Sequence, residues 1–332
     1  MKIGILGAGT WGLALARLLF NSGHEVYVWS ALPEEIDELD RTRKQKNLQG
    51  MIIPAGIVFT KVIEEACKDK DIVLFAVPSV YVRATAKTAA PYVKDGQIIV
   101  DVAKGLESET FLTLSEVITS EIPQSKVVAL SGPTHAEEVA KDLPTTIVAA
   151  HEDLTVAEFV QKAFTNKVLR VYTNTDIKGV ELCGALKNII ALAVGIASGL
   201  GYGDNIKAAI MTRGLAEIAR LGSAIGCLPE TFSGLAGMGD LIVTATSIHS
   251  RNNRCGHLLG EGIPTEEAVK LVGMVVEGIN AIPAAIEMSD KYGVNMPIIR
   301  SVAKVVNHGE DPEVVIRDLM EKDAGTELVE HS

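Results

Sequence analysis

A glycine-rich turn near the start of the chain constrains the fold more than any other stretch. Gly7, Gly9 and Gly12 form a Gly-x-Gly-x-x-Gly pattern that follows the apolar segment Lys2–Leu6 and opens an amphipathic segment. The first glycine permits a tight turn, the second lets the backbone approach a pyrophosphate, and the third allows close packing of helix on strand. Because a second strand-like segment, Glu25–Trp29, follows at the required distance, the turn predicts a dinucleotide-binding α/β fold.

The rest of the chain divides into two parts with different hydrophobic patterns. Up to about residue 175, short apolar runs alternate with amphipathic segments, which is typical of strands joined by crossover helices. Beyond that point, long helical runs take over. A chain of 332 residues also fits two cores better than one. We therefore expect a Rossmann-type doubly wound sheet in residues 1–175 and an all-helical domain in residues 176–332, joined by a direct passage from strand to helix.

The two patterns locate the individual elements. The predicted strands are Lys2–Leu6, Glu25–Trp29, Ile72–Val77, Ile98–Val102, Lys126–Leu130, Thr146–Ala149 and Leu169–Tyr172. The predicted helices of the first part are Trp11–Asn21, Pro33–Thr42, Lys61–Lys68, Phe111–Glu121 and Val156–Phe164, and those of the second part are Ile177–Ser198, Ile206–Ile225, Thr265–Leu271, Val276–Tyr292 and Ser301–Val306. Glycine-rich loops are expected at Gly199–Gly203 and Gly234–Gly239, and such loops often line sites.

Composition excludes several classes of protein. Hydrophobic residues make up 47% and charged residues 22% of the chain, which is ordinary for a globular protein. The net charge of −11 argues against nucleic acid or an anionic membrane surface as a partner. The four cysteines form no CxxC pair and the histidines no HExxH motif, so we expect no metal and a reducing cytoplasm. The longest apolar run, Ile189–Ala197, is too short for membrane insertion.

One lysine, Lys187, stands inside the otherwise apolar stretch Gly179–Leu200. Taking an ammonium out of water is costly unless it is paired or loses its proton. Its neighbours at helical spacing include Cys183, Gly184 and Ala191, and these small residues leave room for a flat ligand. A desolvated lysine there could titrate near neutrality and act as a base. The alternative is a lysine that extends from a core helix to solvent.

Further candidates follow the predicted strands, at the edge where doubly wound sheets bind ligands. Lys104, in Ala-Lys-Gly, can offer its ammonium to a phosphate or a carbonyl oxygen. Gly132 and Thr134 add backbone donors and a hydroxyl just ahead of a helix, beside His135. A solvated lysine and ordinary loop chemistry are the alternatives, and the histidine is more simply a packing or surface residue.

The helical half contributes a carboxylate and a cluster of polar donors. Asp240 follows three glycines and either caps the next helix or bonds substrate hydroxyls. Ser250, Arg251 and Asn252 open the densest donor cluster of this half. A guanidinium beside a hydroxyl and amides matches the oxygens of a phosphate, and an acidic protein needs such a patch to hold an anion. A solvated loop is the alternative for this cluster.

The choice between NAD and NADP as cofactor is left open by the sequence. NAD-binding folds commonly place an acid about 20 residues after the glycines, where it bonds the adenosine ribose. Here residues 29–32 read Trp-Ser-Ala-Leu, the nearest acids are Glu34 and Glu35, and no arginine follows this strand until Arg41.

Six segments, taken in order, closely resemble the bacterial-type NAD(P)-dependent glycerol-3-phosphate dehydrogenases over nearly the whole chain. They are GAGTWGLALA, AKGLE, SGPTHAEEVA, ELCGALKNIIA, GLAGMGDL and SRNNRCG. The resemblance implies a helical domain like the C-terminal domain of 6-phosphogluconate dehydrogenase, with the active site in the cleft between the two domains. It also implies that Lys187 is the catalytic base that handles the proton of the C2 hydroxyl.

The resemblance further implies two sets of binding residues. Those similar to the family's substrate contacts are Lys104, Gly132, Thr134, Asp240, Ser250, Arg251 and Asn252. Those similar to its cofactor contacts are Thr10, Trp11, Lys104, Ala136, Arg251, Val275 and Glu277, which join Gly7, Gly9 and Gly12 of the glycine turn. Two positions depart from the family: Thr134 replaces the usual serine but keeps the hydroxyl, and Ala31 lies where many members use arginine or histidine to contact the 2′-phosphate of NADP.

The implied reaction is reversible hydride transfer between sn-glycerol 3-phosphate and dihydroxyacetone phosphate, supplying glycerol 3-phosphate for phospholipid synthesis. A related β-hydroxyacid or hydroxyacyl dehydrogenase is one alternative, but those typically carry asparagine four residues after the lysine, where this chain has Ala191. A non-catalytic nucleotide sensor is another, although a sensor has no need of a lysine inside an apolar helix. The expected partner is a small phosphorylated substrate. The oligomeric state, with a homodimer as one option, is not determined by the sequence.

Overall fold

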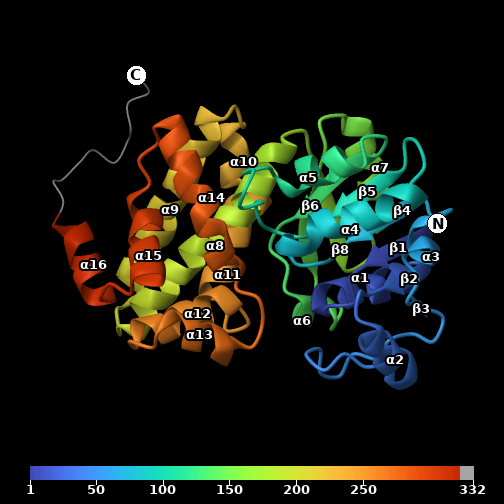
Figure 1. The fold of residues 1–332 in the computed structure, drawn as a ribbon, viewed down its shortest axis with the longest axis horizontal. Helices are drawn as coiled ribbons and strands as arrows, with labels where there is room; N and C mark the ends of the chain where they lie inside the picture. The colour runs from blue at the N-terminus through green and yellow to red at the C-terminus, as the bar shows by residue number, and fades with distance from the viewer. Residues whose placement is uncertain (322–332) are drawn as a thin grey trace.

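The structure is a computed structural model that describes residues 1–321 of the chain. Two domains lie side by side, a sheet covered by helices and a bundle of helices (Figure 1). The last strand of the sheet, β8, ends at Asn174, and the central helix of the bundle, α8, begins at Ile177. The expected direct passage from strand to helix is therefore present. The part of the expected helical domain beyond residue 321 lies outside the described residues.

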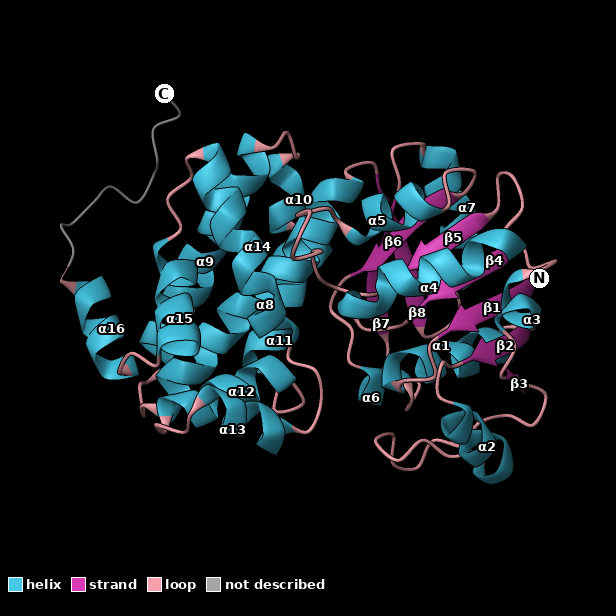
Figure 2. Ribbon diagram, viewed as in Figure 1, coloured by secondary structure: helices cyan, strands magenta, loops and turns pink. Residues whose placement is uncertain are grey.

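One eight-stranded sheet organises the N-terminal domain (Figure 2). Its order is β3-β2-β1-β4-β5-β6-β7-β8, and all neighbouring pairs are parallel except β6 and β7. The first six positions have the doubly wound order, which confirms the predicted Rossmann-type sheet. The strands are β1 (Lys2–Leu6), β2 (Glu25–Trp29), β3 (Val58–Thr60), β4 (Ile72–Phe75), β5 (Ile98–Asp101), β6 (Lys126–Ser131), β7 (Thr145–Ala150) and β8 (Leu169–Asn174).

Helices cover both faces of this sheet, so strands such as β4 are buried throughout. One core holds the apolar sides of α1, α2, α6 and α7, and the other holds those of α3, α4 and α5. The bounds are α1 (Thr10–Asn21), α2 (Pro33–Thr42), α3 (Ile63–Cys67), α4 (Val82–Ala89), α5 (Leu114–Glu121), α6 (Ala136–Val139) and α7 (Leu154–Phe164), with short 3-10 turns at η1 (Ser79–Tyr81) and η2 (Ala90–Tyr92).

The differences from the predicted elements of this domain have local causes. The edge strand β3 was not predicted, because three residues are too few to show an alternating pattern. The helix predicted from Phe111 begins instead at Leu114. Thr113 caps it in a capping box with Glu116, and Phe111 has a left-handed backbone conformation (φ 60°) that ends any helical path.

The C-terminal domain is built around α8 (Ile177–Gly199). This helix is long and apolar enough to cross a membrane, but its whole apolar window is buried inside the molecule, as expected of a core helix. The surrounding helices are α9 (Asp204–Ala224), α10 (Pro229–Ser233), α11 (Asp240–Thr246), α12 (Arg251–Gly260), α13 (Thr265–Val272), α14 (Glu277–Tyr292), α15 (Pro297–His308) and α16 (Pro312–Met320). The all-helical class is confirmed.

One predicted loop of this domain is helical instead, and the helix α12 was not predicted. The glycine-rich segment Gly234–Gly239 contains a π-helical turn, η3 (Leu235–Gly239), which continues into α11. The donor cluster that begins at Ser250 opens α12, with the serine as its N-cap. Both were missed because glycine and asparagine are weak helix formers, and packing against α8 overrides that preference.

Glycines allow α12 to lie against α8 at backbone contact. A Cβ added to Gly195 of α8 would stand 2.2 Å from a backbone oxygen of α12, and one on Gly256 would stand 2.2 Å from a backbone oxygen of α8. Gly199 and Gly260 repeat the arrangement one turn further along. This contact fixes the N-terminal end of α12, with Arg251, beside the apolar helix that carries the lysine.

We predict that Gly195→Ala lowers the free energy of unfolding by about 1–3 kcal/mol, because the obstacle is backbone and cannot rotate away. Urea unfolding monitored by circular dichroism measures the change. Gly203→Ala is the matched control, since Gly203 has an ordinary φ of −78° and no atom within 4 Å of the added carbon. Equal stabilities of the two variants would contradict backbone contact between the helices.

Candidate active site

A single buried carboxylate joins the two domains by binding two lysines. Asp240, the first residue of α11, is only 1% exposed. Its Oδ1 accepts a hydrogen bond from Nζ of Lys187 at 2.5 Å, and its Oδ2 accepts one from Nζ of Lys104 at 2.7 Å. Lys104 follows β5 of the sheet, whereas Lys187 lies in α8, so the carboxylate bridges the junction between the domains.

Lys187 is buried, as its apolar surroundings in the sequence predict, with 5% of its surface exposed. Its Nζ also donates to Oγ1 of Thr244 at 2.6 Å, and that hydroxyl in turn donates to the backbone oxygen of Asp240. Burial and, to a smaller extent, the like charge of Lys104 lower the pKa of Lys187 to about 7, against the opposing effect of Asp240. The amine can therefore exchange a proton near neutrality. Its catalytic role stays a prediction.

Lys104 contacts the other candidate residues that follow the strands of the sheet. Its Nζ donates to the backbone oxygen of Gly132 at 3.0 Å and lies 3.5 Å from Oγ1 of Thr134. Gly184 faces this lysine from α8, and a Cβ there would meet Oγ of Ser131 at 3.2 Å. The small residue thus lets α8 pass close to the lysine and to the end of β6.

The predicted phosphate cluster at the start of α12 is only partly free to bind an anion. Oγ of Ser250 accepts from the backbone N–H of Asn253, and Arg251 donates to the backbone oxygen of Val275 at 3.1 Å. Asn252 is buried: its amide donates to the Asn188 side chain and its oxygen accepts from the backbone N–H of Gly278, each at 2.9 Å. Of the three predicted phosphate contacts in this cluster, Arg251 is the charged one, and Asn252 holds α12 to its neighbours.

The glycine turn has the form that a dinucleotide needs. Gly7 has φ 121°, and a Cβ there would stand 2.6 Å from a backbone oxygen of the neighbouring β4 segment. Gly9, the N-cap of α1, has no atom within 4 Å of an added Cβ, so its face is open. Thr10 and Trp11 begin the helix, whose N–H groups point at this open face. The residues present therefore fit a pyrophosphate.

Glu277 contacts the N-terminal domain from the start of α14. Its carboxylate accepts from the backbone N–H of Ser79 at 3.1 Å and from the Ser79 hydroxyl at 2.6 Å. Val275 lies two residues earlier, beside the guanidinium of Arg251. Ala136 is placed apart from these residues, at the first position of α6 after the β6 loop. The predicted cofactor set thus has members in both domains, and their contacts with a cofactor stay predictions.

Several residues of the site escaped the sequence analysis. Thr244 lies four residues after Asp240, a spacing that would have marked it as a partner had α11 been predicted. Asn188 and Ser79 carried no such signal, because their partners lie far away in the sequence. Within residues 1–321, no group of three or more His, Cys, Asp or Glu side chains is placed to hold a metal ion.

A dinucleotide turn on a doubly wound sheet, with a buried lysine of lowered pKa at the junction with a helical domain, defines a nicotinamide-dependent dehydrogenase. Comparisons with known proteins narrow this class. Two family models match the chain. The model of the NAD-dependent glycerol-3-phosphate dehydrogenase N-terminus matches residues 2–157, and the model of its C-terminus matches residues 176–317. The chain belongs to this family.

Individual members of the family are similar to this chain over nearly its full length. The chain is 65% identical over 333 residues to a glycerol-3-phosphate dehydrogenase [NAD(P)+] 2 from Lactobacillus delbrueckii subsp. bulgaricus, covering 98% of this chain and 99% of the relative. It is 50% identical over 332 residues to a glycerol-3-phosphate dehydrogenase [NAD(P)+] from Agathobacter rectalis, covering 100% and 98%. The crystal structure of the Coxiella burnetii glycerol-3-phosphate dehydrogenase superposes with a TM-score of 0.93 at 34% identity, covering 97% and 99%.

The lowered pKa of Lys187 predicts how the free energy of unfolding depends on pH. Between about pH 7 and its unfolded value of about 10.4, the unfolded chain binds more protons at this site than the folded chain. This lysine therefore adds to the free energy of unfolding as the pH rises through that window. In Lys187→Met the contribution is missing, so the difference in stability, variant minus wild type, falls between about pH 7 and about pH 9. Urea unfolding at several pH values measures it, and a difference that stays constant would mean an ordinary lysine.

Proposed function

We propose that this chain interconverts sn-glycerol 3-phosphate and dihydroxyacetone phosphate with NAD(P) as cofactor. The observation that carries the proposal is the Lys104–Asp240–Lys187 arrangement, in which a lysine able to gain or lose a proton lies beside a second cation. The names of the full-length relatives support the same activity. We further propose that the glycerol 3-phosphate serves phospholipid synthesis in the cytoplasm, a reducing compartment that suits four free, buried cysteines.

The chemistry assigns distinct tasks to the two lysines. When bound, NAD(P)H supplies the hydride that adds to the C2 carbonyl carbon of dihydroxyacetone phosphate. Negative charge then grows on the carbonyl oxygen, and Lys187 as an ammonium stabilises it and donates the proton. In the oxidative direction, the neutral amine of Lys187 accepts the proton of the C2 hydroxyl. A pKa of about 7 keeps both protonation states available at neutral pH.

The phosphate group is bound by local positive charge within an acidic chain. With both lysines protonated, the two ammoniums and one carboxylate leave a single positive charge at the junction. Arg251 adds a guanidinium at the N-terminal end of α12, where the helix dipole also favours an anion. Asn252, engaged with Asn188 and Gly278, acts in this proposal by holding the helix start in place.

The end of β2 favours NAD over NADP. Oγ of Ser30 donates to a carboxylate oxygen of Glu35 at 2.6 Å, which anchors this acid at the strand end where NAD-binding folds bond the adenosine ribose. The residue after Ser30 is Ala31, which brings no cation to meet a 2′-phosphate. We propose that Glu35 takes the place of the acid that the sequence spacing lacks, and that it repels the phosphate of NADP.

One assay tests the activity directly. The absorbance of NADH and NADPH is followed with dihydroxyacetone phosphate, unphosphorylated dihydroxyacetone, a β-hydroxyacid and an acyl-CoA substrate. The proposal requires turnover with dihydroxyacetone phosphate at a kcat/KM far above that of the unphosphorylated ketone. Turnover of the hydroxyacid or acyl-CoA substrate instead would favour a related dehydrogenase. Tight NADH binding without any turnover would favour a nucleotide sensor.

Lys187→Ala is expected to lower kcat by at least about a hundredfold with little change in the Kd of NADH, because the proton donor is lost while the glycine turn is untouched. Steady-state kinetics and NADH fluorescence titration measure the two quantities. Lys178→Ala, at an exposed lysine of the same helix, is the control and should match the wild type. Near-normal turnover of Lys187→Ala would remove this lysine from the mechanism.

For cofactor choice, the wild type is expected to use NADH with a higher kcat/KM than NADPH. Glu35→Gln should lower the NADH/NADPH ratio of kcat/KM by about tenfold, since it removes a negative charge that faces the 2′-phosphate. Glu34→Gln is the matched control on the same helix turn, exposed to solvent, and should leave the ratio unchanged. A wild type that prefers NADPH, or a ratio unaffected by Glu35→Gln, would contradict this assignment.

A further inference from the structure

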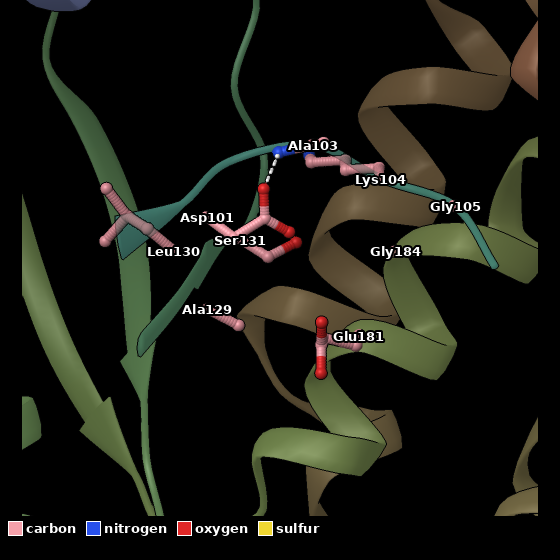
Figure 3. Close-up of a pocket in the computed structure, with 9 residues that line it drawn as sticks. All are labelled: Asp101, Ala103, Lys104, Gly105, Ala129, Leu130, Ser131, Glu181 and Gly184. Atoms are coloured by element: carbon pink, nitrogen blue, oxygen red, sulfur yellow. Dashed lines mark hydrogen bonds between the residues drawn. The ribbon is translucent and has the colours of Figure 1, made fainter. Parts of the chain in front are cut away.

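A small cavity lies beside Lys104, between the ends of β5 and β6 and the helix α8 (Figure 3). Its volume is about 10 Å³, room for about one water molecule. Most of its lining is apolar or backbone. The polar side chains that line it besides Lys104 are Asp101, Ser131 and Glu181.

Two polar atoms of this cavity have no hydrogen-bond partner among the residues that the structure describes. They are Oδ2 of Asp101 and Oγ of Ser131, in residues that are 2% and 5% exposed. The other carboxylate oxygen of Asp101 accepts from the backbone N–H of Ala103 at 3.1 Å. Leaving a buried donor or acceptor unsatisfied is costly, because the group has lost its hydrogen bonds to water. Two such atoms lining one water-sized space therefore indicate a shared hydrogen-bonding occupant.

The charges around the cavity decide which protonation state Asp101 adopts. Burial raises the pKa of Asp101 well above its usual range, and Glu181 on α8 raises it further. The ammonium of Lys104 is directed to Gly132, Thr134 and Asp240 rather than to Asp101. Glu181 accepts two hydrogen bonds from Ser115, and burial still raises its pKa to about 7. Burial and Glu181 both favour the protonated, neutral form of Asp101, which can donate one hydrogen bond and accept others.

The cavity is lined by residues that are next in the chain to Lys104 and to its hydrogen-bond acceptor Gly132. Asp101 bonds the N–H of Ala103, the residue before Lys104. Ser131 precedes Gly132, whose carbonyl oxygen receives the ammonium of Lys104. Gly184 lies almost one helical turn before the other lysine of the site. The cavity therefore lies where the turn after β5, the end of β6 and α8 meet.

We propose that Asp101 and Ser131 are positioning residues, which hold one water molecule in this cavity and through it fix the Ala103–Gly105 turn, and with it the ammonium of Lys104, against α8. The inference rests on the proposed function only in taking Lys104 as a substrate contact. It makes Asp101 act as a neutral hydrogen-bonding group, so an amide of the same shape can replace it.

Paired substitutions at Asp101 test the proposal. Asp101→Asn keeps an acceptor for Ala103 and a donor for the cavity, so its KM for dihydroxyacetone phosphate should stay within about twofold of the wild type. Asp101→Ala removes both, and we expect its KM to rise about tenfold, with kcat changed less and the Kd of NADH unchanged. Ser131→Ala should move KM in the same direction by a smaller factor. Ser125→Ala, whose hydroxyl bonds a carbonyl of its own turn, is the control.

Gly184→Ala reaches the same cavity without changing any polar group. The new methyl would lie 3.2 Å from Oγ of Ser131 and 3.6 Å from Cγ of Lys104. It should therefore raise the KM for dihydroxyacetone phosphate as Asp101→Ala does, and it carries the test if Asp101→Ala does not fold. An unchanged KM in Gly184→Ala and Ser131→Ala, or an Asp101→Asn variant impaired as strongly as Asp101→Ala, would overturn the proposal.

A measurement without substrate separates this inference from the proposed function. A neutral Asp101 in the folded chain binds a proton that the unfolded chain releases above about pH 4, so wild-type stability falls with pH from this group. Asp101→Asn lacks that loss. Its stability relative to the wild type, from urea unfolding, should increase as the pH rises above about 5. A flat difference would mean an ionised Asp101 and overturn the inference, whereas failure of wild-type turnover would strike the proposed function alone.

Discussion

The carboxylate of Asp240 is the interaction on which the arrangement of the site depends. Two ammoniums cannot lie close together in a buried place without a counterion, because their repulsion and their loss of hydration both oppose it. Asp240 accepts from both lysines and so allows a positively charged junction inside a chain of net charge −11. Burial still leaves Lys187 with a lowered pKa, because Asp240 only partly offsets the loss of hydration and the like charge of Lys104 acts against it.

The packing of α8 makes this interaction geometrically possible. Near the C-terminal end of α8, glycines hold α12 at backbone contact; near its N-terminal end, the carboxylate of Glu181 accepts from the backbone N–H of Ser115 in α5 at 2.8 Å. A small apolar cluster that includes Val180, Ala236 and residues of β6 and β7 closes the same junction. The first half of α8 is thereby attached to the sheet domain, although it belongs in sequence to the helical one. This attachment fixes the position of Lys187 in α8 relative to Lys104 at the end of β5.

The sequence was sufficient for features that depend on local pattern and insufficient for those that depend on distant pairing. The glycine turn, seven of eight strands and the burial of Lys187 follow from spacing and polarity within short windows. Asp240 was recognised as a candidate, but its two partners lie 53 and 136 residues away, and nothing local distinguishes a shared counterion from a helix cap. Asn252 shows the same limit. The sequence indicated a substrate contact in a donor cluster, but its side chain is buried and donates to Asn188, which lies 64 residues away.

The most direct test of this account is the pH dependence of kcat/KM for dihydroxyacetone phosphate reduction in the wild type and in Lys104→Met. The profile of kcat/KM reports groups of the free enzyme, so it should reveal the proton of Lys187 near its lowered value of about 7. The Lys104→Met substitution removes the ammonium that repels the charged form of Lys187. It also leaves Lys187 as the one lysine of the pair bonded to the carboxylate of Asp240. The account predicts that the apparent pKa rises in Lys104→Met. An apparent pKa that stays the same in the variant would contradict the claim that Lys104, by sharing the carboxylate of Asp240, lowers the proton affinity of Lys187.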